Sequence, residues 1–134
     1  MPQAQDLVLK NGASTPVDKT FSLTSPAAGD GGKALWRLKE GSIAKVFPFI
    51  EATARPTGNG GHARRLEVRM NIPSSYTTPA TGLTAVGSSA LFKFEVVMPL
   101  DYPENLKPDF VAFAKNLVAN ALMQSMMNDA TPAT

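Results

Sequence analysis

Residues 64–73, which read RRLEVRMNIP, decide the fold class of this chain. Apolar and polar side chains alternate strictly from residue 65 to residue 72, which is the period of a strand with one buried face and one solvated face. Residues 91–99, LFKFEVVMP, repeat the alternation. The two stretches therefore predict antiparallel strands that share an apolar face and a polar face.

The remaining strands are expected on both sides of these two stretches. Residues 6–24 predict a β-hairpin whose turn is Asn11-Gly12, a pair typical of type I′ turns. Residues 34–39 alternate, and residues 43–55 predict a long extended segment with a bend or strand change at Pro48. Residues 74–88 are rich in Thr, Ser, Gly and Pro and predict a long loop.

After residue 99 the period changes from that of a strand to that of a helix. Apolar residues between 105 and 128 recur at helical spacing, with a possible break at Asn120, and Pro108 is tolerated only in a first turn. The fold class is therefore α+β: an N-terminal hairpin (6–24), an antiparallel sheet of about five strands (34–99) and two C-terminal helices (105–128). The helices offer more apolar surface than one half-polar sheet needs, which favours a partner subunit.

Composition limits the class of protein further. The chain has 134 residues, fits a single domain (1–134), and is 43% hydrophobic, so it is not disordered. It has no cysteine, and no apolar run is long enough to span a bilayer. Residues 1–6 lack the apolar core of a signal peptide. We expect a protein made and used in a cytoplasm, without a membrane partner.

The residue types needed for catalysis are nearly absent. His62 is the only histidine, in a glycine-rich turn, and no nucleophile or orienting group is indicated beside it. No phosphate loop, dinucleotide fingerprint or metal-ligand spacing is present. We expect no enzymatic activity, no catalytic residue, no metal site and no cofactor.

The polar side of the predicted sheet is the candidate binding surface. Its basic residues would contact phosphates, and its Asn, Thr and Glu would contact base edges or hydroxyl groups. Phe47 and Phe49 keep the parity of this side and could stack on bases, although burial in a core is an equal alternative. An ordinary solvated sheet face is the other interpretation. The candidate RNA-binding residues are Lys45, Phe47, Phe49, Glu51, Thr53, Arg55, Arg65, Glu67, Arg69, Asn71, Leu91, Lys93 and Glu95.

The order of these elements resembles the coat protein of single-stranded RNA bacteriophages of the levivirus type. Residues 64–73 are similar to the family's basic alternating strand that ends in proline, and residues 91–99 are similar to its last strand, including the glutamate at Glu95. The resemblance implies that two subunits join their sheets edge to edge and interlock their helices. It also implies an icosahedral shell of such dimers around genomic RNA. The implied dimer-interface residues are Leu106, Phe110, Phe113, Leu117, Leu122 and Met126.

The resemblance further implies that the inner sheet face binds an RNA hairpin, which would repress translation and mark the genome for packaging. Basic residues at 45, 65, 69 and 93 and the glutamate at 95 match the family's pattern. Five positions depart from it: Phe47, Phe49, Glu51, Glu67 and Leu91, where Leu91 replaces a tyrosine that stacks on a base. The implied location is the virion, assembled in a bacterial host cytoplasm. The alternatives are a small dimeric RNA-binding protein that forms no shell, and an α+β enzyme.

Overall fold

The computed structural model describes residues 2–134, except for the side chain of Asn59. The chain forms two compact units, Met1–Met98 and Pro99–Thr134. The single-domain expectation stays a prediction.

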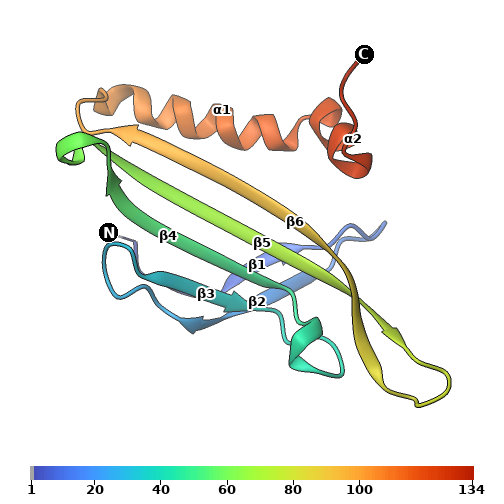
Figure 1. Ribbon diagram of the computed structural model, residues 1–134. Helices are drawn as coiled ribbons and strands as arrows, with labels where there is room; N and C mark the ends of the chain where they lie inside the picture. The colour runs from blue at the N-terminus through green and yellow to red at the C-terminus, as the bar shows by residue number, and fades with distance from the viewer. Residues whose placement is uncertain (1) are drawn as a thin grey trace. The chain divides into compact units, whose positions relative to one another are not determined.

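The first unit is a six-stranded antiparallel sheet in which each strand lies beside its neighbours in the sequence (Figure 1). Its strands are β1 (Leu7–Lys10), β2 (Asp18–Ser25), β3 (Lys33–Arg37), β4 (Phe49–Thr57), β5 (Ala63–Thr77) and β6 (Thr84–Pro99). The sheet class is thus confirmed, with the N-terminal hairpin forming one end of the same sheet.

Cross-strand pairing explains why these strands form a two-faced sheet. Trp36 pairs with Ile50 and Ile50 pairs with Met70, so these three side chains share the apolar face. The core of this unit is small: its buried apolar residues are Phe21, Ala34, Val46 and Ile50.

The second unit is helical. A short 3-10 turn (Glu104–Leu106) leads into α1 (Lys107–Ala119), and α2 (Ala121–Asp129) follows directly. Pro108 lies in the first turn of α1, where its missing N–H is not needed. The Asn120 side chain accepts a hydrogen bond of 2.9 Å from the Leu122 backbone N–H and caps α2. The predicted helical region and its break at Asn120 are confirmed. No helix in the described part of the chain has the length and apolar character needed to cross a membrane.

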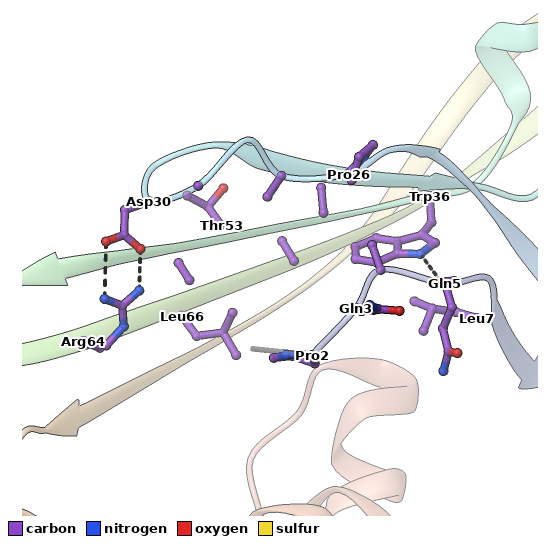
Figure 2. Close-up of a pocket in the computed structure, with 16 residues that line it drawn as sticks. Pro2, Gln3, Gln5, Leu7, Pro26, Asp30, Trp36, Thr53, Arg64 and Leu66 are labelled. Carbon is purple, nitrogen blue, oxygen red and sulfur yellow. Dashed lines mark hydrogen bonds and ion pairs between the residues drawn. The ribbon is translucent and has the colours of Figure 1, made fainter.

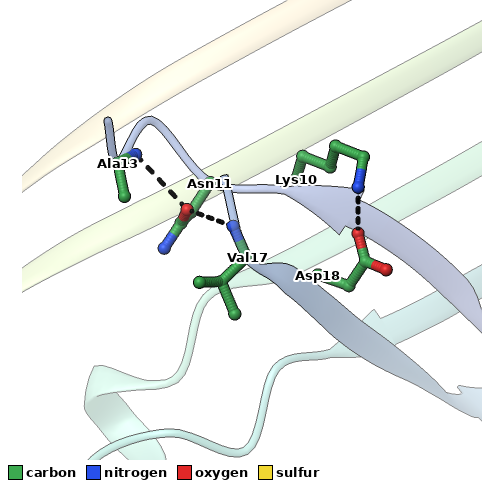
Figure 3. Close-up of polar contacts among 5 residues, drawn as sticks. All are labelled: Lys10, Asn11, Ala13, Val17 and Asp18. Atoms are coloured by element: carbon green, nitrogen blue, oxygen red, sulfur yellow. Dashed lines mark hydrogen bonds and ion pairs between the residues drawn. The ribbon is translucent and has the colours of Figure 1, made fainter. Parts of the chain in front are cut away.

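The predicted type I′ turn at Asn11-Gly12 is wrong. Residues 11–17 form a longer loop, and Gly12 does not adopt a positive φ. The Asn11 side-chain oxygen accepts hydrogen bonds from the backbone N–H groups of Ala13 (3.3 Å) and Val17 (2.9 Å), as Figure 3 shows. This local bonding competes with the tight turn and stabilises the wider loop.

The predicted loop at residues 74–88 is also mostly wrong, because β5 and β6 continue through it and leave only residues 78–83 as the turn. The last β4 partner on β5 is Asn71, so Pro73 lies where β4 no longer pairs, and a free strand edge tolerates proline. Ser74 Oγ donates to the Ser88 carbonyl at 2.8 Å and links the two strands. The result is a two-stranded ribbon that extends beyond Phe49, the first residue of β4 (Figure 1).

Candidate nucleic-acid interface

The polar face of the sheet is defined by the pairing register of β3, β4 and β5. Residues paired across neighbouring strands point to the same face. On β4, Phe49 pairs with Arg37 and Asn71, and Glu51 pairs with Leu35 and Arg69. Further along, Thr53 pairs with Lys33 and Glu67, and Arg55 pairs with Arg65. All eight site residues predicted on β4 and β5 thus share this face.

Two predicted site residues lie outside the strand. Lys45 belongs to a 3-10 turn (Ala44–Val46), and Phe47 follows that turn, so the prediction of one extended segment from residue 43 is wrong for its first half. Pro48 cannot donate a ladder hydrogen bond, and burial of Val46, which is 6% exposed, favours the turn. Lys45 is exposed, and Phe47 is half-buried.

The face also holds two cations that sequence reasoning missed. Lys33 and Arg37 lie on β3 beside predicted residues of β4. The alternation of residues 34–39 held a signal for Arg37, and Lys33 comes directly before this stretch with the same parity as Arg37. Only the pairing register shows that this alternation places them on the polar face and not on the apolar one.

Carboxylates neutralise one end of the polar face, which we call the paired end (Arg55, Arg65, Glu67 and Glu95). Glu67 lies 3.4 Å from Arg55 and 3.7 Å from Arg65, measured between charged atoms. Arg65 Nε lies 3.2 Å from Glu95 Oε1, which is ion-pair range, although the N–H is not aligned as a hydrogen bond. These contacts join β4, β5 and β6, and they place Glu95 on the polar face. By alternation, Leu91 and Lys93 share that face.

The other end, which we call the open end (Arg37, Phe49, Arg69 and Asn71), has a different character. The Arg69 guanidinium carbon lies over the Phe49 ring, 5.9 Å from its centroid. Among the described residues, the ion pairs include neither Arg37 nor Arg69. Glu51, which pairs with Arg69 in the register, lies 3.9 Å from Lys33. Positive charge is therefore concentrated at the open end.

The apolar face carries a groove of about 580 Å3, drawn in Figure 2. Ala34, Ala52 and Ala54 line it, with Trp36 and Leu66. Trp36 Nε1 donates to the Gln5 carbonyl at 2.7 Å, which fixes the N-terminal segment at this groove. Most of the lining residues are apolar or small.

An ion pair closes one end of this groove. Arg64 donates to both carboxylate oxygens of Asp30, at 2.5 and 3.3 Å (Figure 2). These hydrogen bonds lower the pKa of Asp30 below its ordinary value of 3.8. The Gly31 backbone N–H donates to the Ala54 carbonyl at 2.9 Å, so the loop after β2 is held to β4 as well.

The predicted dimer-interface residues of the helical unit are mostly exposed. Phe113 is 74% exposed, Leu117 57% and Leu122 55%. Phe110 is half-buried beside Tyr102, with 6.5 Å between ring centroids, and Met126 is half-buried. A hollow between α1 and α2 is lined by Phe113, Leu117 and Met123 among others. The apolar stripe predicted from the sequence is present, and the helical unit does not cover it.

Comparisons with known proteins place this architecture. No protein-family model matches the chain, and no curated protein matches it. Among solved structures, the virus-like particle of bacteriophage NT-214 matches with a TM-score of 0.86 and 25% identity, covering 99% of this chain and 100% of that one.

Two further structures agree with that match. The virus-like particle of Beihai levi-like virus 21 has a TM-score of 0.84 at 19% identity, covering 99% of each chain. The bacteriophage GA protein capsid has a TM-score of 0.68 at 16% identity, covering 92% of this chain and 93% of that one. Over nearly its whole length, the chain therefore has the fold of these phage capsid subunits.

Proposed function

We propose that this chain is a structural, non-enzymatic capsid protein that dimerises and assembles into an icosahedral shell around single-stranded RNA. The observation that carries the proposal is the whole-length likeness to subunits of virus-like particles. The protein would reside in the virion and be assembled in the cytoplasm of a bacterial host. Its partners would be further copies of itself and RNA.

The free edge of β6 supports dimerisation. β6 is the last strand of the sheet and has 16 residues, so one of its edges has no partner strand among residues 2–134. A long exposed edge with apolar side chains tends to pair with another strand. Leu91, Phe94 and Val97 are 53%, 43% and 44% exposed. A second copy of β6 would continue the sheet across a two-fold axis.

The exposed helical stripe supports interlocking. Phe113 and Leu117 lie on α1 with more than half of their surface in water, while the apolar groove of the sheet is floored by three alanines. Small floor residues allow a helix to approach closely. We assign this groove to the helices of the second copy, which would bury both apolar surfaces at once.

The polar face supports RNA binding. Its cations are Lys33, Arg37, Arg55, Arg65, Arg69 and Lys93, and its carboxylates are Glu51, Glu67 and Glu95, so positive charge is in excess. Phosphate contacts of this kind give salt-dependent, sequence-independent affinity. Recognition of a particular RNA hairpin, with translational repression and genome marking, is the finer part of the proposal.

Assembly tests the proposal directly. Full-length protein is expressed, purified, and studied by light scattering and negative-stain microscopy, and its RNA content is measured from the ratio of ultraviolet absorbances. The proposal predicts closed particles that contain RNA. Dimers that bind RNA without forming particles would support the small RNA-binding protein instead, and a monomer without RNA would refute both.

A further inference from the structure

We infer that single-stranded RNA is bound at the open end of the polar face, by a guanidinium platform in which Phe49 positions Arg69 and Arg37 adds a second charge. Arg65 then serves to hold strands together and is not a main RNA contact. This inference rests on the proposed RNA-binding function. It assigns different roles to the two ends of the polar face: RNA binding to the open end and strand association to the paired end.

The ring of Phe49 determines how Arg69 is presented. Phe49 is half-buried at the start of β4, and the Arg69 guanidinium carbon is 5.9 Å from its ring centroid. The quadrupole of an aromatic ring attracts a cation that lies over it. The Arg69 side chain therefore loses conformational freedom before RNA binds, and binding costs less entropy. The outer side of the guanidinium then remains for an unpaired base, because bases stack on arginine planes as they do on aromatic rings.

Arg37 and Asn71 flank this platform. Both pair with Phe49 in the register, one from β3 and one from β5. Arg37 Nε is buried and has no hydrogen-bond partner among the described residues, and no ion pair of the described residues uses its charge. A phosphate beside the stacked base would meet this charge, and the Asn71 amide can both donate to and accept from a base edge. The ligand class is therefore a nucleotide of single-stranded RNA with its base unpaired.

The paired end is unsuited to the same task. Arg65 has Glu67 at 3.7 Å and Glu95 at 3.2 Å, and its side chain is 33% exposed. RNA phosphates would have to compete with two carboxylates there. Because Arg65 contacts residues of both β5 and β6, its charge serves to hold the strands.

Binding of a labelled, unstructured RNA oligonucleotide to the purified full-length protein, measured over a salt series, tests the inference. Arg69→Ala and Arg37→Ala should each weaken binding and reduce the salt slope by about 0.7, the value per neutralised phosphate on single strands. Phe49→Leu should weaken binding several-fold with the salt slope unchanged, because no charge is lost. Phe49→Tyr should restore it. Arg65→Ala should weaken binding and reduce the salt slope by clearly less than Arg69→Ala, because Glu67 and Glu95 already neutralise the Arg65 charge.

The possible outcomes separate the inference from the proposed function. If Arg65→Ala weakens binding as much as Arg69→Ala, or if Phe49→Leu has no effect, the division of the face is wrong while RNA binding stands. If the parent protein binds no RNA, the proposed RNA function fails and the inference fails with it. Circular dichroism of each variant, with Lys115→Ala in the exposed part of α1 as the matched charge-loss control, separates a binding defect from unfolding.

Discussion

The sheet unit and the helical unit differ in how far each buries its own apolar residues. The sheet unit has a small core of Phe21, Ala34, Val46 and Ile50. No residue of α1 or α2 is buried, and Phe113 is 74% exposed. Helices of 13 and 9 residues are marginally stable in water without packing. The comparison teaches that the apolar surface of these helices is not covered within their own unit, which is why we propose that a second copy covers it.

The largest expected effect comes from removing the most exposed aromatic side chain of the helical unit. If a second copy buries Phe113, then Phe113→Ala costs about 3–5 kcal/mol per subunit, the usual loss for a buried phenylalanine. We expect aggregated or unfolded protein, measured by size-exclusion chromatography and urea unfolding.

Lys115→Ala, also on α1 and exposed, is the control and should change the free energy of unfolding by less than about 0.5 kcal/mol. A well-folded, soluble monomer of Phe113→Ala would count against interlocked helices.

A second substitution tests the groove from the sheet side. Ala52 lines a groove with about 580 Å3 of space in the isolated chain, so Ala52→Leu would be accommodated there without strain. If a second copy fills the groove, the same change overpacks the interface by about 1–3 kcal/mol. We expect the dimer to be weakened, as measured by the protein concentration at which it dissociates. Unchanged dimer stability would mean that the groove remains empty.

The turn of the β5–β6 ribbon should affect assembly and not folding. Thr78 N–H donates to the Leu83 carbonyl at 2.9 Å, and the turn lies beyond the part of β5 that pairs with β4. Replacing residues 78–82 by a two-residue turn should leave the dimer folded and change particle formation or particle stability. Microscopy measures particle formation, and thermal unfolding measures particle stability. Loss of the dimer would show that the ribbon belongs to the folding core.

The smallest expected effect concerns pH. The hydrogen bonds from Arg64 lower the pKa of Asp30, so this pair contributes stability above the ordinary pKa of 3.8 and loses it as the pH falls through the lowered value. Both side chains are about half exposed, so the contribution is small. Thermal unfolding between pH 2 and 5 should show a slightly steeper loss for the parent than for Arg64→Gln. Identical slopes would mean that the pair adds nothing.

Much of this fold follows from sequence periodicity. Alternation at residues 65–72, and less strictly at residues 91–98, corresponds to a sheet with one apolar and one polar side, and the apolar stripe at residues 106–117 corresponds to a helix. The predictions were wrong for two loops, because the structure there depends on interactions that sequence periodicity does not reveal. The Asn11 side chain bonds its own loop, and the serine and threonine residues after Pro73 form strands through cross-strand contacts.

The candidate site was predicted less completely than the fold. Alternation identified Arg65, Glu67 and Arg69 as neighbours on one face, and pairing confirms that placement. Which acid contacts which base depends on register across strands distant in sequence, as with Arg65 and Glu95. Phe47 and Phe49 are two residues apart, so alternation alone places them on the same face. The structure separates them because a 3-10 turn before Pro48 keeps Phe47 outside β4.

The mass of the purified protein over a range of concentrations is the most direct test of the proposal that a second copy covers the apolar surface of the helices. Light scattering should give closed particles, or dimers when particles are dissociated, with the unfolding midpoint rising with protein concentration. A folded monomer at every concentration, with an unfolding midpoint independent of concentration, would contradict the proposal that a second copy covers the helices.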